Sequence, residues 1–451
     1  MAMGAVKDKA ATLQVEMVCL DELVPAEDRY RRLDELVDWS FVRDAAIPYY
    51  AGEVGRPSVD PIVLMKLMLA GALEGIGSVR ELVRMSAMRL DLRRFLGYGF
   101  AERLPAHQTI SHAQTRRFVD QQLFERLFVR SVALCREHGL LEGTHLSVDG
   151  FHAEASAALS SLRASLEPVE GEDETAGERE AEGPERPQLA LCEPRSGPTP
   201  KRRSSNATSS SRTDPDAKLR GKPGQRPHLV QRGQVAVDPK ARCIVSCLGE
   251  QADGHEGDAL APITDRARFL CPELASVGAD SGFAAERVWR DQAQRHIEAF
   301  VPPQRTMLPK DGEPRTEAQR QALLARERCD SGRGIWAHKR RMADAEGAIA
   351  ELKHQGTMAR ARCRGTPLFH VQLLVDCAAI NLKRIAIHAG EAAEGRAAQP
   401  DSGTAVPLNA ASDAVGASPS REGALRPALA APALPRSAAK PQLWSFSVSL
   451  N

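Results

Sequence analysis

Two aspartates in the sequence each follow a short apolar run and precede small residues. Asp149 ends the run HLSVD before Gly150, and Asp280 ends the run SVGAD before Ser281 and Gly282. We expect each carboxylate at a strand end with a turn beyond it, and so at the exposed edge of a sheet. Carboxylate oxygens suit Mg²⁺, and two such cations about 3.5–4 Å apart can activate the attacking oxygen and stabilise the leaving oxygen in phosphodiester displacement.

A third carboxylate has to come from elsewhere in the chain. Glu346 lies in a predicted helix with Lys353 seven residues later, so both side chains project from one face. Glu346 could complete a metal site while Lys353 neutralises a DNA phosphate nearby. Glu351 points about 140° away from Glu346 around the helix, and we predict it at the surface.

Ordinary structural roles also explain these acids. An Asp before Gly at a strand end is often a turn former, and Glu with Lys on one helix is often a solvated pair. The spacing of the acids by itself therefore leaves a metal site and an ordinary surface both open.

The charge distribution is uneven although the formal net charge of the 451 residues is only +1. Acidic residues are concentrated in 167–185, and basic residues in 201–232 and 339–364. The last block contains Lys339, Arg340, Arg341, Arg360, Arg362 and Arg364. Such blocks are typical of solvated or disordered segments, and they also suit a polyanionic partner.

Composition indicates a soluble globular protein of two or three domains, with 42% hydrophobic and 26% charged residues. No apolar run approaches a membrane span or a secretory signal. The nine cysteines form no CxxC pair, and we predict Cys243 and Cys247 to be buried reduced thiols. We therefore expect a cytoplasmic protein without a membrane partner.

Residues 20–142 are predicted to be helical throughout. One helix begins with Ser58 as its cap and Pro61 in its first turn, and a Gly-containing break precedes a second helix that starts at Ser78. Such a pair resembles a helix-turn-helix but is equally common in any helical bundle. Gly139 ends a later helix.

Strands begin near residue 145 with HLSVDG. QRGQVAVDP and RCIVSCLGE then form a predicted hairpin, and SVGAD and HIEAFVPP are further strands around the helical AAERVWRDQAQR. HKRRMADAEGAIAELKHQ and LFHVQLLVDCAAINLKRIAIH are helical. The pattern predicts a mixed sheet covered by helices. Residues 165–206 and 390–443 have too few large apolar residues to fold.

Phrases along the whole chain resemble one protein family. They are DELVDWSFV, GRPSVDPIVLMKLMLAGALEGIGSVRELVR and LPAHQTISHAQTRRF in the helical part, then VDGFHAEASAALSSL, SSSRTDPDAKLRGKPGQ, QVAVDPKARCIVSCLGEQADGHEGD, VGADSGF, AEGAIAELKHQGTMARARCRG and NLKRI. Together they resemble the DDE transposases of bacterial insertion sequences, in the branch with an N-terminal helical transposase domain. The resemblance covers 20–163 and 206–388.

The resemblance implies a role for each acid. It makes Asp149, Asp280 and Glu346 the catalytic residues and the ligands of Mg²⁺, for which Mn²⁺ can substitute. Lys353 follows the helical Glu at the family's spacing and implies a DNA contact, to which we add Arg340 and Arg341. Cleavage at terminal inverted repeats and strand transfer into target DNA are implied, with double-stranded DNA as partner and a homo-oligomer in the DNA complex at the nucleoid.

The implied fold is α+β or α/β, with a ribonuclease-H-like mixed sheet flanked by helices and preceded by an all-helical domain. We assign 20–142 to the helical domain, for DNA end binding or dimer contacts, and 145–388 to the catalytic domain. A flexible insertion is expected at 165–206, and a disordered tail at 389–451.

Some positions depart from the family's pattern. Lys339 and Met342 stand where related sequences often have Tyr and Arg before the catalytic Glu. Two alternatives therefore stay open: a catalytically inactive or repurposed DNA-binding protein with the same fold, and another ribonuclease-H-like nuclease. Asp214 and Asp216 could contact DNA or order their loop, and we leave them outside the site.

Overall fold

A computed structural model describes residues 17–50, 58–114, 121–164, 206, 209–221, 226–310 and 312–397. The chain divides into two compact units, Met1–Ala398 and Gln399–Asn451, and all described residues belong to the first. The predicted insertion at 165–206, apart from Asn206, and the part of the predicted tail from 398 to 451 lie outside the described residues.

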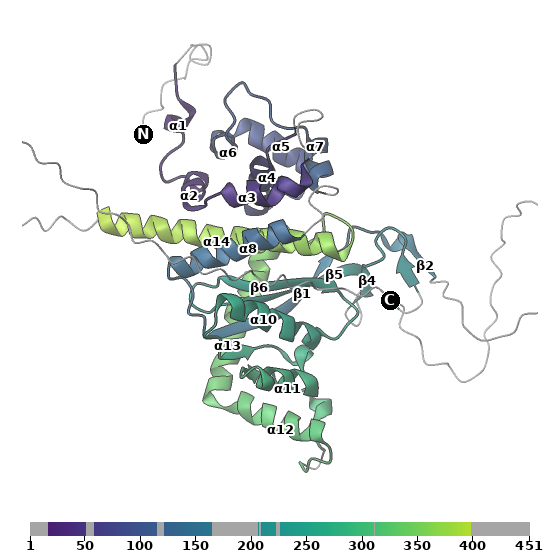
Figure 1. The fold of residues 1–451 in the computed structure, drawn as a ribbon. Helices are drawn as coiled ribbons and strands as arrows, with labels where there is room; N and C mark the ends of the chain where they lie inside the picture. The colour runs from purple at the N-terminus through teal and green to yellow at the C-terminus, as the bar shows by residue number, and fades with distance from the viewer. Residues whose placement is uncertain are drawn as a thin grey trace, which may run out of the picture. The chain divides into compact units, whose positions relative to one another are not determined.

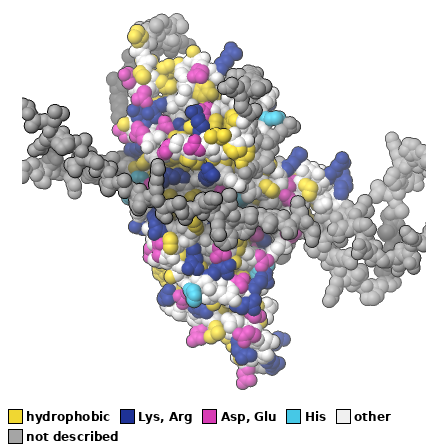
Figure 2. Space-filling model, in the orientation of Figure 1, with side chains coloured by type: hydrophobic (Ala, Val, Ile, Leu, Met, Phe, Trp, Pro, Cys, Tyr) yellow, Lys and Arg dark blue, Asp and Glu magenta, His cyan; other side chains and the backbone are white. Residues whose placement is uncertain are grey.

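Helices make up the regular structure of the N-terminal segment, as predicted (Figure 1). They are α1 (Leu20–Leu23), α2 (Arg29–Leu36), α3 (Ser40–Ala46), η2 (Ile47–Tyr49), α4 (Pro61–Leu73), α5 (Val79–Met88), α6 (Leu90–Leu96), α7 (His107–His112) and α8 (Gln122–Glu137). The described surface in Figure 2 carries side chains of both charge signs, interspersed, in keeping with the small net charge.

The helix ends follow local capping chemistry. Asp60, not the predicted Ser58, caps α4, because Pro61 fixes the first helical position and the residue directly before it holds the cap. Ser78 caps α5 as predicted, with its side chain accepting a backbone N–H of the first turn. Gly139 follows α8 at φ +68°, a left-handed conformation that glycine adopts without strain.

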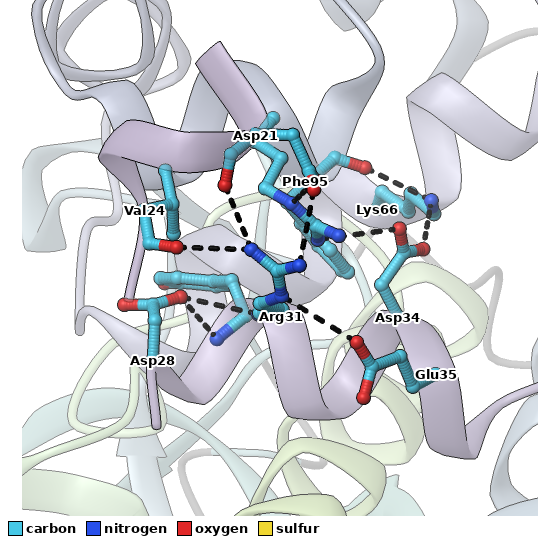
Figure 3. A network of polar contacts seen from close by, with 10 residues as sticks. Asp21, Val24, Asp28, Arg31, Asp34, Glu35, Lys66 and Phe95 are labelled. Atoms are coloured by element: carbon cyan, nitrogen blue, oxygen red, sulfur yellow. Dashed lines mark hydrogen bonds and ion pairs between the residues drawn. The ribbon is translucent and has the colours of Figure 1, made fainter. Parts of the chain in front are cut away.

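Polar contacts join the helices of this segment (Figure 3). Arg31 of α2 donates to the carboxylate of Asp21 in α1 at 3.0 Å. Lys66 of α4 is buried, pairs with Asp34 of α2 and donates to the carbonyl oxygen of Phe95 in α6 at 2.9 Å. A buried ammonium needs such partners, because an unpaired charge away from water is costly.

A six-stranded mixed sheet follows, which confirms the predicted mixed α/β class. Its strands are β1 (His145–Glu154), β4 (Lys218–Arg220), β5 (His228–Val237), β6 (Ile244–Gln251), β7 (Ser276–Gly278) and β8 (Glu298–Phe300). On one side, β1 pairs with β5, and β5 pairs in turn with β4 and β6; all of these pairs are antiparallel. On the other side, β1 pairs with β7, and β7 pairs with β8; both of these pairs are parallel. The β5–β6 hairpin confirms the prediction. The strands β2 (Leu162–Ala164) and β3 (Ser209–Ser211) pair separately.

Helices cover the sheet. They are α10 (Leu260–Leu270), α11 (Glu286–Gln294), α12 (Glu317–Asp330), α13 (Gly332–His354) and α14 (Thr366–Ala397), with the 3₁₀ turns η4 (Leu159–Ser161), η5 (Glu256–Ala259), η6 (Ser281–Phe283) and η7 (Arg305–Met307). Helix α13 packs against β1, β5, β7 and β8, whereas α10 and α14 pack against β5 and β6. The prediction did not include α10 or α12.

Helix α14 contacts α2, α4 and α8 as well as β5 and β6, so it lies between the helical segment and the sheet (Figure 1). It continues to Ala397, past residue 388, where the catalytic segment is predicted to end. The Ala-rich composition that suggested a tail also favours helix, because Ala has the highest helix propensity. None of the described helices is both long and apolar enough to cross a membrane. Cys243 and Cys247 are buried free thiols, as predicted.

Candidate carboxylate site

Asp149 lies in the middle of β1 and not at its end, so that prediction is wrong. The strand continues through Gly150 to Glu154, and its pairing with β5 runs without interruption from Ser147 opposite Val237 to Glu154 opposite Val230. The residues after Gly150 alternate between buried and exposed, a strand pattern that the short apolar run did not reveal. The side chain of Asp149 is only 14% exposed.

Asp280 lies beyond the end of β7, at the predicted strand end, where its carboxylate accepts the backbone N–H of Gly282 at 2.9 Å. The parallel register pairs Ser147 of β1 with Gly278 of β7. Each aspartate is two residues past this paired position. Because side chains alternate with a period of two, the register brings both carboxylates to the same region of the sheet.

Helix α13 brings a third carboxylate and a guanidinium to this region. Arg341 Nη1 lies 2.7 Å from Asp149 Oδ2, and Arg341 Nη2 lies 3.4 Å from Glu346 Oε1. The Arg341 side chain is 10% exposed and that of Glu346 is 53% exposed. The buried guanidinium of Arg341 thus links Asp149 of the strand to Glu346 of the helix. The sequence predicts Arg341 as a DNA contact, and in the structure it contacts these two acids.

Burial raises the pKa of Asp149 to about 6. The neighbouring Arg341 and the N–H of Gly150 oppose the shift, whereas the charges of Asp280 and Glu346 add to it. Desolvation disfavours the charged form of a carboxylate, and a nearby positive charge restores it. The three carboxylates therefore influence one another electrostatically.

Lys353 lies over the ring of Phe151, with its Nζ 5.4 Å from the ring centroid. Phe151 is two residues after Asp149, on the same face of β1. The Phe151 ring in turn lies against Gly233 of β5, where even a Cβ would come within 2.6 Å of it. Only glycine leaves room for this ring. The backbone of β5 at Gly233 therefore fixes the position of the Phe151 ring, over which Lys353 lies.

The donor set fits a hard divalent cation in chemical type, since Asp149, Asp280 and Glu346 offer only carboxylate oxygens. The desolvated Asp149 also needs a positive neighbour. In this arrangement Arg341 supplies that charge. Within the described ranges, no three or more His, Cys, Asp or Glu side chains are grouped closely enough to hold a metal ion.

Two other predicted residues lie away from the carboxylates. Arg340 pairs with Asp344 at 2.9 Å and donates to the carbonyl oxygen of Pro239 in the β5–β6 hairpin. Glu351 is not the surface residue that we predicted: its side chain is 19% exposed and pairs with Lys383 and Arg384 of α14. Glu351 thus faces α14, which removes it from competition with Glu346.

Asp214 and Asp216 order a junction between loops. Buried Asp214 accepts the N–H of Gly365 at 3.1 Å, and Asp216 accepts the N–H of Thr366 at 2.9 Å. Both carboxylates therefore position the start of α14.

Glu256 is a further acid that residue chemistry did not single out. A Cβ placed on Gly282 would lie 2.5 Å from Glu256 Oε2 and 3.0 Å from Asp280 Oδ1. Both carboxylates thus lie against the same glycine. The only signal for Glu256 in the sequence is its place in the phrase GEQADGHEGD.

Two family models match the chain. The model described as "Transposase domain (DUF772)" matches residues 18–116, which span α1 to α7. The model described as "Transposase DDE domain" matches residues 308–386, which include α12, α13 and most of α14. No curated protein and no solved structure matches the chain at a significant level.

Proposed function

Because its two domains make this chain an insertion-sequence DDE transposase, we propose that it cuts DNA at its element's terminal inverted repeats and joins the ends to target DNA. The observation that supports this most is the link that Arg341 forms between Asp149 and Glu346, beside the strand that leads to Asp280. In the proposal, Asp149 of β1, Asp280 after β7 and Glu346 of α13 close around one cation when it binds together with DNA.

The order of the strands supports the ribonuclease-H-like fold that the resemblance implies. On one side of the central β1 lies β5, followed by β6, and each is antiparallel to the strand before it. On the other side lies β7, followed by β8, and each is parallel to the strand before it. In this order the first aspartate is on the central strand, the second follows the adjacent parallel strand, and the glutamate is on the helix that packs on both.

In the proposed reaction, water displaces the 3′ oxygen at a phosphodiester of the element end, leaving a 3′-OH on that end and a 5′-phosphate on the flanking DNA. The 3′-OH then attacks a target phosphodiester, forms a new P–O bond and releases the target's own 3′-OH. Asp149, Asp280 and Glu346 would hold the Mg²⁺ or Mn²⁺, which supplies electrophilic stabilisation of the reacting oxygens when bound.

The side chains of this chain have separate tasks in the proposal. Arg341 neutralises Asp149 before the substrate complex forms and keeps the buried carboxylate charged. Lys353, held over Phe151, is aimed at a DNA phosphate close to the carboxylates. Arg340 lies nearer the start of α13 than Lys353, and it stays proposed as a peripheral DNA contact only, because Asp344 already pairs with it.

The test compares nicking of DNA that carries the terminal inverted repeats, with Mg²⁺ or Mn²⁺, by wild type and by Asp149→Asn. We expect the variant to nick more than about 100-fold slower, because even the loss of a group that only supports a metal ligand typically costs about 10–100-fold. Asp265→Asn is the matched control, since Asp265 is an exposed acid paired with Arg295, and it should nick like wild type.

Equal nicking by wild type and Asp149→Asn would refute the role of the carboxylates. No nicking by a folded wild type that still binds the repeats would favour the inactive DNA-binding alternative. Nicking of any branched or mismatched duplex without preference for the repeats would favour another ribonuclease-H-like nuclease.

A further inference from the structure

A polar groove lies beyond the end of β1, the strand that carries Asp149. Its volume is about 620 Å³, and the loop after β1, the loop before β5 and the loop between α13 and α14 line it. Its charged side chains are those of Arg226, Arg360 and Arg364 and that of one acid, Glu154, and Ser156 and Thr213 also line it.

The three arginines of the groove lack the acid partners that several other arginines of the described residues have. Arg226, Arg360 and Arg364 are exposed, and none of them pairs with a carboxylate of the part of the chain that the structure describes. Arg232, Arg340 and Arg341, by contrast, each pair with an acid. Exposed guanidinium groups without an internal partner favour an external anion, and the guanidinium fork matches the geometry of phosphate.

The backbone holds this groove in a defined shape. Glu154 at the end of β1 donates its N–H to the carbonyl oxygen of Ala359 at 3.0 Å and accepts the N–H of Ala361 at 2.7 Å. These bonds attach the loop that carries Arg360 to the strand that carries Asp149. The spacing between the groove and the carboxylates is therefore set by the strand.

A second groove, of about 510 Å³, adjoins the first groove on the side of Lys353. It shares Ser156 and Arg360 with the first groove and also includes Lys353. Lys353 lies over Phe151, two residues from Asp149. Basic side chains therefore line both grooves, from Lys353 over Phe151 to Arg226 and Arg364.

We propose that the two grooves bind the phosphate backbone of the DNA that extends from the cleavage point, with Arg226, Arg360 and Arg364 as phosphate contacts. This inference rests on the proposed function. From Asp149 to Glu154 the strand covers roughly 17 Å, at about 3.3 Å per residue. A duplex lying along β1 rises about 3.4 Å per base pair, so the arginines meet phosphates about five base pairs from the scissile bond.

The test measures binding of a labelled duplex carrying the terminal inverted repeat, by fluorescence anisotropy, in EDTA so that no cleavage takes place. Each of Arg226→Gln, Arg360→Gln and Arg364→Gln should weaken binding roughly fivefold at 0.15 M salt, because log K falls with log salt at about 0.9 per phosphate contact. In the triple variant, the steepness of log K against log salt concentration should fall by roughly three, because three phosphate contacts are lost. Arg320→Gln, at an exposed arginine of α12 paired with Glu317, should leave both quantities unchanged.

Phosphate ethylation interference gives the position of the contacts. Wild type should be sensitive about five base pairs from the cleavage point, and the triple variant should lose that sensitivity while keeping wild-type circular dichroism. An unchanged salt slope in the folded triple variant would overturn the inference, whatever the nicking activity. If instead the slope falls as expected but wild type does not nick, the groove stands as a DNA site and the proposed function fails.

Discussion

Asp149 and Arg341 show how one residue's environment assigns its task. Basic residues in a charged block are normally expected at the surface, yet Arg341 is nearly buried and spans two acids. Removing one partner of such a buried pair leaves an uncompensated charge, which is typically worse than replacing both. Arg341 is therefore best regarded as part of the carboxylate site, and its contribution to DNA binding stays a prediction.

His145 provides a residue-scale prediction for stability. Its ring is buried, with Nδ1 2.8 Å from Ser276 Oγ, and burial lowers its pKa from 6.5 to about 4. In the unfolded chain the ring takes up a proton as the pH falls through about 6.5, whereas in the folded chain it does so only near 4. The free energy of unfolding should therefore fall between pH 6.5 and 4, by up to roughly 3 kcal/mol at about 1.4 kcal/mol per pKa unit.

The measurement is urea unfolding at pH 7.5, 5.5 and 4.5 for wild type, His145→Gln and His354→Gln. The first variant should lose much of the pH dependence in this window, whereas the second, at an exposed histidine, should keep it. A wild-type slope that survives in His145→Gln would show that other groups cause the acid sensitivity.

At the scale of single elements, α14 stabilises the edge of the sheet through one side chain. Asn381 is fully buried; its Oδ1 accepts the N–H of Ile244 at 2.8 Å, and its Nδ2 donates to the carbonyl oxygen of the same residue at 2.8 Å. The amide also reaches Ser131 of α8 at 3.3 Å. One side chain thus pairs both backbone groups at the start of β6, where the register with β5 shifts.

Asn381→Leu should lower the free energy of unfolding by about 2–4 kcal/mol, because two buried backbone groups would lose their partners at roughly 1–3 kcal/mol each. Chemical denaturation would measure the loss. His388→Ala, an exposed change on the same helix, should stay within about 0.5 kcal/mol of wild type. A loss below 0.5 kcal/mol for Asn381→Leu would mean that the edge of β6 does not depend on this amide.

At the scale of the whole compact unit, α14 joins the helical segment to the sheet. It contacts α2, α4 and α8 as well as β5 and β6, and most of its residues from Phe369 to Ala386 are buried. The predicted segments 20–142 and 145–388 therefore bury apolar surface against the same helix. Since neither segment can expose that surface without cost, we expect the unit to unfold cooperatively.

Two buried tryptophans report on this cooperativity. Trp39 lies in the helical segment and Trp289 in the helix beside β8. We compare two single-tryptophan variants, one that keeps only Trp39 and one that keeps only Trp289, with the other tryptophans changed to Phe. Thermal unfolding followed by tryptophan fluorescence should give the same midpoint in both variants. Two midpoints separated by more than about 4 °C, the upper end of the shift that 1 kcal/mol causes in a domain of about 150–250 residues, would instead indicate two independently folding parts.

The sequence by itself determined the features that depend on local periodicity. It identified the helical segment, the β5–β6 hairpin, the position of Asp280 after a strand, and the helix on which Glu346 and Lys353 project together. These follow from apolar repeats, caps and turn residues within a few positions of one another. The types of the carboxylate residues, on which the proposed hard-cation chemistry depends, could also be identified there.

Only the tertiary structure decided which way the side chains of α13 point. Arg341 meets Asp149 across 192 positions of sequence, Arg340 turns to the β5–β6 hairpin, and Glu351 turns to α14. Likewise, β1 continues past Asp149 because β5 pairs with it along its whole length. The physical reason is that a helix or strand pattern fixes angular spacing, whereas the absolute direction depends on packing against distant segments.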